Sequence, residues 1–91
     1  MSDAPHRELS THEVAVLEFE RACFQFDGSK EANIRGRLDM SPTTYYRTLQ
    51  AIVGQRAAFE HDPLTVMRVR RQRDERRRVR VEGRRADPGR R

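Results

Sequence analysis

The chain has 91 residues, of which 35% are hydrophobic and 36% are charged, and its formal net charge is +5. This length allows one small domain with tails, and the large charged share leaves few residues for a sealed core. A single cysteine excludes an intramolecular disulfide and a cysteine-based metal cluster within one chain. No stretch approaches the roughly 18 apolar residues that span a bilayer, and the N-terminus lacks the basic and apolar segments of a signal peptide. These features favour the cytoplasm.

Basic and acidic residues are separated along the chain. Residues 1–67 hold seven basic and ten acidic groups, a net charge of −3, whereas residues 68–91 hold twelve arginines and four acidic groups, a net charge of +8. Apolar residues recur at helical spacings from Leu9 to Met67 and become rare beyond Val69. We therefore predict a disordered N-terminus at 1–8, a folded domain at 9–67, and an arginine-rich helical arm with a disordered tail at 68–91.

The first predicted helix begins after Ser10 and continues to about Phe26. Ser10 and Glu13 form the Ser-x-x-Glu pattern of a capping box, and Leu9 and Val14 occupy the positions of a hydrophobic staple. Apolar residues spaced by three or four positions form its inward row, which consists of Val16, Phe19, Cys23 and Phe26.

A second, shorter helix is predicted at about 30–38. Asp27-Gly28 ends the helix before it, Ser29 can cap it, and Asp39-Met40 forms the turn that follows. Its apolar positions are Ala32, Ile34 and Leu38.

The third predicted helix opens at Ser41-Pro42, because serine caps a helix and proline is favoured at the first helical position. Gly54 closes it. Its inward residues follow at helical spacing and are Tyr45, Leu49, Ile52 and Val53.

A fourth helix starts at Asp62-Pro63 by the same logic of cap and proline, with Leu64 and Met67 as its anchors. We expect it to continue to about Val81, because arginine is a good helix former. The sequence thus predicts an all-α fold: a four-helix helix-turn-helix domain whose last helix is extended and arginine-rich.

Residues 29–53 have the arrangement of a helix-turn-helix, two short helices joined by a turn. Ile34 and Leu38 seat the first helix, and Met40 fills the turn. Side chains that face outward from the second helix are predicted to contact DNA: Ser41, Thr43, Thr44, Tyr46, Arg47 and Gln50. We expect Arg47 to bind guanine, Gln50 to bind adenine, and the small hydroxyl residues to hold phosphates.

Two usual markers of this motif are missing. Arg35 stands where many regulators have a small residue, and Asp39 stands where many have glycine. The alternative interpretation is a helical hairpin with an ordinary solvated face.

The C-terminal arm is dense in arginine, with only Asp74 and Glu75 as acidic residues between 68 and 81. Mutual repulsion at this density favours a polyanionic partner. We expect nucleic acid; RNA, acidic lipid and a solvated tail are the alternatives, and no large apolar face supports membrane binding. The arm residues predicted to bind DNA are Arg68, Arg70, Arg71, Arg73, Arg76, Arg77, Arg78 and Arg80.

No catalytic arrangement is visible in the sequence. His6, His12 and His61 do not have metal-ligand spacing, and there is no glycine-rich phosphate loop. Cys23 lies on the apolar face of the first helix, where a cysteine is typically a core residue rather than a nucleophile. We therefore expect no enzymatic activity, no metal and no cofactor.

Several segments resemble a family of small actinobacterial proteins defined as a domain of unknown function. They are Leu17-Glu18-Phe19-Glu20-Arg21, Gly28-x-Lys30-Glu31, Met40-Ser41-x-Thr43-x-Tyr45-Tyr46, Asp62-Pro63-Leu64 and Arg68-x-Arg70-Arg71. The resemblance covers about residues 9–78, and Asp39 departs from a glycine common in the family. It implies a sigma-factor-like helix-turn-helix, DNA binding and association with the nucleoid.

These observations predict a protein that binds double-stranded DNA, in the cytoplasm at the nucleoid. A transcriptional regulator and a chromosome organiser both fit, and the shortage of base-reading side chains favours the organiser. The competing hypothesis is a protein-interaction module that contacts the transcription machinery, through RNA polymerase or a sigma factor. A homodimer is compatible with either.

Overall fold

The computed structural model describes residues 8–86, with side chains to residue 81. Over this range the chain is all-α, with five α-helices, one short 3-10 helix and no strand. The elements in order are α1 (Thr11–Ala22), η2 (Cys23–Gln25), α2 (Lys30–Leu38), α3 (Pro42–Ile52), α4 (Arg56–His61) and α5 (Pro63–Ala86). The prediction of a disordered N-terminus falls on residues 1–8, of which only Glu8 is described. The tail expected beyond Ala86 also lies outside the described residues.

Four helices begin at caps that the sequence predicted. Ser10 and Glu13 form a complete capping box, in which Glu13 N–H donates to Ser10 Oγ (3.1 Å) and Ser10 N–H donates to Glu13 Oε1 (3.0 Å). At α2, α3 and α5 the caps are Ser29, Ser41 and Asp62. The side-chain oxygen of each accepts a hydrogen bond from the backbone N–H three residues later in the chain, at 3.0, 3.1 and 3.2 Å. Each such cap stabilises its helix by about 1 kcal/mol.

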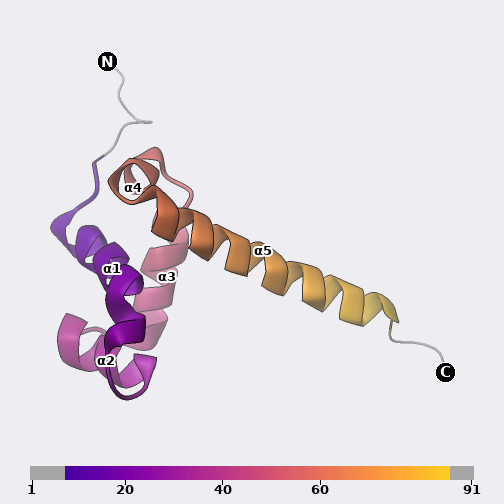
Figure 1. The fold of residues 1–91 in the computed structure, drawn as a ribbon, viewed down its shortest axis with the longest axis horizontal. Coiled ribbons are helices and arrows are strands. Elements are labelled where there is room, and N and C mark those ends of the chain that lie inside the picture. Colours follow the sequence, from indigo (N-terminus) through magenta and orange to yellow (C-terminus); the bar gives the residue numbers. More distant parts are fainter. Residues whose placement is uncertain (1–7, 87–91) are drawn as a thin grey trace.

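The first four helices form the body of the molecule, and α5 projects from it (Figure 1). Helix α1 packs against α3 and α5, α2 packs against α3, and α4 packs against α5. At 1.5 Å per residue the 24 residues of α5 extend over about 36 Å. Only its first turns can therefore contact the body, and the rest continues outward as an arm.

The core lies where α1, α3 and the start of α5 meet. The residues predicted to face inward from α3 are confirmed, since Tyr45, Leu49, Ile52 and Val53 are all buried. Phe19, also predicted to be inward, packs its ring against Tyr45 in an edge-to-face contact at 5.5 Å. The other buried hydrophobic residues are Val16, Leu17, Ile34, Ala58, Val66 and Val69.

The first helix is shorter than predicted. It ends at Ala22 instead of about Phe26 and is followed by the 3-10 turn η2. Phe26 takes an extended backbone conformation, with its ring 5.6 Å from that of Phe19 and the Arg37 guanidinium 3.7 Å above it. The chain thus leaves the helix early and folds Phe26 back onto the body. In α2, Ala32 is exposed and only Ile34 and Leu38 contact the core.

The prediction for the start of the last helix was wrong in its buried face. Leu64 and Met67 are exposed (79% and 45%), whereas Val66 and Val69 are buried. The packed part of the chain therefore reaches beyond residue 67, where the sequence placed its end. The structure also adds α4, a helix that was not predicted, and α5 continues to Ala86 instead of about Val81.

Candidate nucleic-acid interface

Helices α2 and α3 are joined by the three-residue turn 39–41, which has the length of a helix-turn-helix connection. Asp39 has φ 55° and ψ 45°, and it is the only non-glycine residue with positive φ in the described chain. Its N–H donates to the Arg35 carbonyl (3.1 Å), which closes α2 at a position where glycine is usual. Met40 and Leu38 pack against the core and hold the turn in place.

The side of α3 opposite the core is polar. Thr43, Thr44, Arg47 and Gln50 are exposed there, as the sequence predicted, and Tyr46 is 37% exposed. Ser41 is already engaged as the cap, and its hydroxyl also donates to Thr44 Oγ1 (3.0 Å). These side chains give α3 a polar surface on the side away from the core.

Helix α5 carries two rows of side chains that lie on opposite sides of its axis, because each follows the three-and-four spacing of one helix face. We call Val66, Val69, Arg73, Arg76 and Arg80 the inner row. We call Leu64, Met67, Arg71, Asp74, Arg78 and Val81 the outer row. Burial of Val66 and Val69 shows that the inner row faces the body. Past the core this row consists of arginines alone.

A groove separates α3 from the inner row of α5, and we call it the α3–α5 groove. It encloses about 100 Å³. Its walls contain Tyr46 and Gln50 from α3, and Gln72, Arg73 and Arg76 from α5, and Lys30 and Glu20 also line it. The structure therefore brings two of the residues predicted on α3 together with two predicted on the arm.

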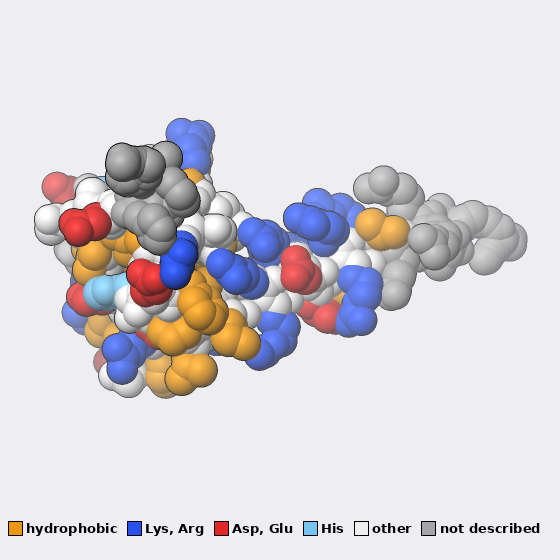
Figure 2. Space-filling view, turned by 90° about the horizontal axis from the view of Figure 1, so that it is seen from above, with side chains coloured by type: hydrophobic (Ala, Val, Ile, Leu, Met, Phe, Trp, Pro, Cys, Tyr) orange, Lys and Arg blue, Asp and Glu red, His pale blue; other side chains and the backbone are white. Residues whose placement is uncertain are grey.

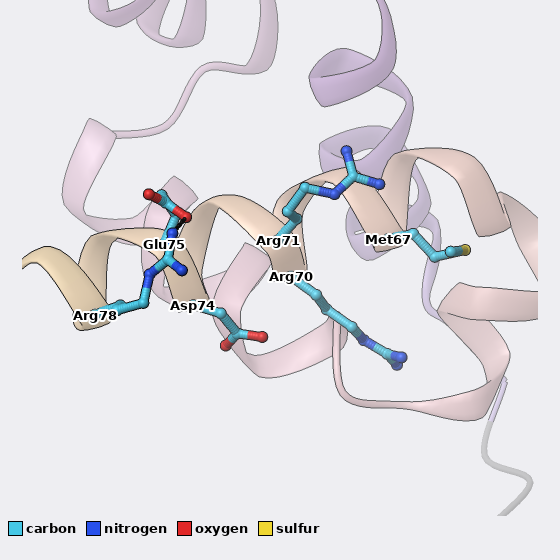
Figure 3. A pocket seen from close by; sticks show the side chains of 6 residues that line it. All are labelled: Met67, Arg70, Arg71, Asp74, Glu75 and Arg78. Atoms are coloured by element: carbon cyan, nitrogen blue, oxygen red, sulfur yellow. Dashed lines mark hydrogen bonds and ion pairs between the residues drawn. The ribbon is translucent and has the colours of Figure 1, made fainter.

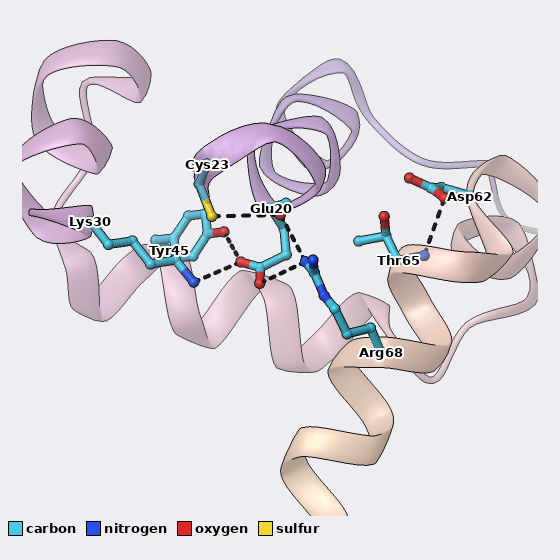
Figure 4. A network of polar contacts seen from close by, with 7 residues as sticks. All are labelled: Glu20, Cys23, Lys30, Tyr45, Asp62, Thr65 and Arg68. Carbon is cyan, nitrogen blue, oxygen red and sulfur yellow. Dashed lines mark hydrogen bonds and ion pairs between the residues drawn. The ribbon is translucent and has the colours of Figure 1, made fainter. Parts of the chain in front are cut away.

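A buried carboxylate, Glu20, lies beside the groove and connects four helices (Figure 4). It is 4% exposed and accepts hydrogen bonds from Tyr45 OH and from Lys30 Nζ (2.9 Å). Arg68 Nη2 donates to its backbone carbonyl (2.8 Å) and lies 3.3 Å from its Oε2. We call Glu20, Lys30, Tyr45 and Arg68 the Glu20 cluster.

The cluster shifts the ionisation of two of its members. Burial raises the pKa of Tyr45 above its ordinary value, and the hydrogen bond and negative charge of Glu20 raise it further. Burial alone would lower the pKa of Lys30, but its hydrogen bond to Glu20 and the Glu20 charge outweigh burial and raise it. At neutral pH, Lys30 is therefore charged and the Tyr45 phenol is protonated.

Two arginines predicted to bind DNA have a different role in the structure. Arg68 bonds to Glu20, and Arg70 Nε donates to the Val53 carbonyl (2.6 Å), with its guanidinium 5.7 Å from the Phe59 ring centre. Both side chains fasten the start of α5 to the body. We therefore leave Arg68 and Arg70 out of the candidate interface.

The remaining predicted arm residues are divided between the faces of α5. Arg80 is exposed one turn beyond Arg76 in the inner row, and Arg77 is exposed on the flank. Arg71 and Arg78 lie in the outer row, away from the groove. Arg78 donates to Glu75, and this hydrogen bond lowers the pKa of the Glu75 carboxyl.

The sequence interpretation did not include Glu20, Lys30 or Gln72 in the site. A signal for Glu20 existed, because it stands four residues after Val16 and next to Phe19, on the apolar face of the first helix. A charge at such a position indicates a buried pair. No comparable signal marked Lys30 or Gln72, since each depends on how α5 and α2 approach α3.

Two other features, a metal site and a membrane span, have no candidate among the described residues. No three or more histidine, cysteine, aspartate or glutamate side chains between residues 8 and 81 lie close enough together to hold a metal ion. Within the same part of the chain, no helix is both long and apolar enough to cross a membrane.

The family to which the chain belongs is shown by a match to a protein-family model. The model of the family described as "Protein of unknown function (DUF3263)" matches residues 8–81. The chain belongs to this family. The match includes α1 to α4 and most of α5, so all residues of the α3–α5 groove lie within it. No curated protein and no solved structure is significantly similar to the chain.

Proposed function

We propose that this DUF3263 protein binds double-stranded DNA with the polar surface of α3 and the inner-row arginines of α5, Arg73, Arg76 and Arg80. The observation that carries the proposal is the α3–α5 groove, where arginines of the arm meet the exposed side chains of α3. Lys30, Arg73 and Arg76 line it, against one carboxylate, Glu20, which already bonds to Lys30 and Arg68. The groove therefore attracts an anion.

The size of the groove supports a phosphate group as that anion. The groove encloses about 100 Å³, which is room for a group as small as a phosphate. Arginine forks match phosphate oxygens, and Gln50 and Gln72 add hydrogen-bond donors. We propose that one DNA phosphate sits there and that the exposed face of α3, with Arg47, enters the neighbouring groove of the duplex.

We further propose that binding is mainly electrostatic and only weakly selective for sequence. Most side chains of the interface are arginines or short hydroxyl residues, which typically contact phosphates. On α3, only Arg47 and Gln50 have the length and the hydrogen-bonding groups to read base edges. Weak selectivity is typical of nucleoid-associated proteins, whereas a sigma-factor-like regulator reads a defined sequence.

Arg76→Gln tests the proposal, with Arg78→Gln as its matched control. Both substitutions remove one positive charge from neighbouring turns of α5, but Arg76 lines the groove and Arg78 bonds to Glu75 in the outer row. If Arg76 neutralises a phosphate, its loss lowers the slope of log K against log salt by about 0.9. We expect a much smaller change for Arg78→Gln. Fluorescence anisotropy with a short duplex at several salt concentrations measures both slopes.

Two comparisons interpret this experiment: the affinity for random and genomic duplexes, and the salt slopes of the wild type and the two variants. An equal loss of affinity on random and genomic duplexes for Arg76→Gln identifies a phosphate contact. Identical slopes for the wild type and both variants contradict the proposed interface. In that case the protein-interaction module becomes the better hypothesis, and recovery of a polymerase subunit from nuclease-treated lysate tests it.

A further inference from the structure

The outer row of α5 is an exposed stripe on the side away from the body. Leu64, Met67 and Val81 are 79%, 45% and 40% exposed, and no other part of the described chain covers them. Figure 2 shows hydrophobic side chains gathered on the body near the start of the arm, with basic side chains along the arm. The alternating spacing of three and four residues from Leu64 to Val81 is that of the seam between two paired helices.

The two acidic residues between 68 and 81 lie on this side of α5. Asp74 belongs to the outer row and Glu75 is beside it, whereas the inner row past the core has only arginines. Figure 3 shows Asp74 and Glu75 together with Met67, Arg71 and Arg78 along this side of the helix. Asp74 Oδ1 lies 3.6 Å from Arg73 Nε, which is a long distance for an ion pair, and the Asp74 side chain is 64% exposed. The carboxylate can therefore accept a further cation.

We propose that the outer row binds the outer row of a second copy of this chain, with the two α5 helices antiparallel. In an antiparallel seam, the numbers of any two residues that face each other across the two copies add up to the same value. One register places Arg71 of each copy opposite Asp74 of the other. The same register places Leu64 opposite Val81, and Met67 against the aliphatic stem of Arg78, whose guanidinium stays with Glu75.

The charges select this arrangement over the alternatives. In a parallel pair, Arg71, Asp74 and Arg78 would each face the same residue of the other copy, and like charges directly opposite are unfavourable. Sliding the antiparallel pair by one heptad in one direction sets Leu64 against Asp74 and Met67 against Arg71. Sliding it by one heptad in the other direction sets Leu64 and Met67 of one copy opposite positions that follow Val81 in the other copy, so that they lose their apolar and aliphatic partners. Only the proposed register matches both the charges and the apolar ends.

A charge-swap experiment on the full chain without DNA tests the pairing. Sedimentation velocity at physiological salt should show a monomer–dimer equilibrium for the wild type. Arg71→Asp and Asp74→Arg should each raise the dimer dissociation constant at least tenfold, because each sets like charges opposite one another twice. The double variant Arg71→Asp/Asp74→Arg should return it to within about threefold of the wild type. Arg76→Asp makes the same charge change as Arg71→Asp in the inner row and should leave it unaltered.

Circular dichroism of each variant establishes that the helices are retained. A wild type that stays monomeric at millimolar concentration overturns the proposal, as does a double variant that is no better than the single ones. An equal loss of the dimer in Arg76→Asp shows that net charge, and not the outer row, is responsible. Because no DNA is present, each of these results is independent of the proposed DNA interface.

Discussion

Glu20 joins four helices through a single carboxyl group and its own backbone carbonyl. Lys30 comes from α2, Tyr45 from α3 and Arg68 from α5, and all three donate to this one residue of α1. A carboxylate this deeply buried is costly without partners, and removing one partner leaves charge uncompensated. The cluster therefore fixes where α5 leaves the body, and with it the position of the arm relative to α3.

The raised pKa values of Tyr45 and Lys30 predict a loss of stability in alkali. Both groups keep their protons in the folded chain at pH values where the unfolded chain releases them, so their contribution is complete below about pH 10. Above that pH, each retained proton lowers the free energy of unfolding by up to about 1.4 kcal/mol per pH unit. We expect the melting temperature, followed by circular dichroism, to fall steeply between pH 10 and 11.

Tyr45→Phe provides the control for this prediction. It removes the phenol but keeps the ring that packs on Phe19. The variant should start from a lower stability at pH 7, because Glu20 loses a donor, and should then decline less steeply in alkali. A parallel decline for both proteins is incompatible with the contribution assigned to Tyr45.

Asp39 is a residue whose backbone conformation suits glycine better. Left-handed φ and ψ are unfavourable for residues with a Cβ, and a carboxylate at the C-terminal end of α2 opposes the helix dipole. We expect Asp39→Gly to stabilise the protein by about 0.5–1 kcal/mol. For a domain of this size that corresponds to a rise of roughly 2–8 °C in melting temperature.

Asp39→Asn separates the two causes. Asparagine tolerates the left-handed conformation and has the shape of aspartate, so this variant removes the charge alone. It should give a smaller rise than Asp39→Gly. A lower melting temperature for Asp39→Gly than for the wild type shows that the Asp39 side chain stabilises the turn.

At the scale of elements, the orientation of α5 depends on which of its apolar residues are buried. Val66 is fully buried and Leu64 is 79% exposed, although they are only two positions apart. Val66→Ala should therefore cost about 1–3 kcal/mol, while Leu64→Ala, which removes more hydrocarbon, should change the free energy of unfolding by less than about 0.5 kcal/mol. Urea unfolding at a protein concentration low enough to exclude self-association measures both. The reverse order would place the outer row against the body.

The helices that could be predicted are those with strong local signals. Ser10, Ser29, Ser41 and Asp62 each provide an oxygen for the free N–H groups of a helix start, and each signal is contained in a few consecutive residues. Helix α4 has no side-chain cap hydrogen bond at Gln55, and Ala58 is its only buried residue. Six residues with so little local stabilisation become helical because of their packing on α5.

For the whole molecule, the sequence predicted the parts of the candidate site but not their arrangement. The exposed face of α3 followed from its apolar period, which is why Arg47 and Gln50 were placed correctly on the surface. The arm was dense in arginine whatever its orientation, so composition alone could not separate the inner row from the outer row. That separation depends on the burial of Val66 and Val69 and on the anchoring of Arg68 to Glu20, which are contacts between distant segments.

The two rows of α5 lie on opposite sides of the helix, and this determines how many separate DNA segments a pair of copies can bind. Joining two copies through their outer rows directs the two inner rows, and the grooves they line, away from each other. Such an assembly has two of the proposed DNA-binding faces, and these cannot both lie on the same straight stretch of duplex. With both the proposed pairing and the proposed DNA interface, the protein would be a connector: it would link two separate segments of DNA or hold one segment in a loop. A monomer with the same residues can only coat a single one.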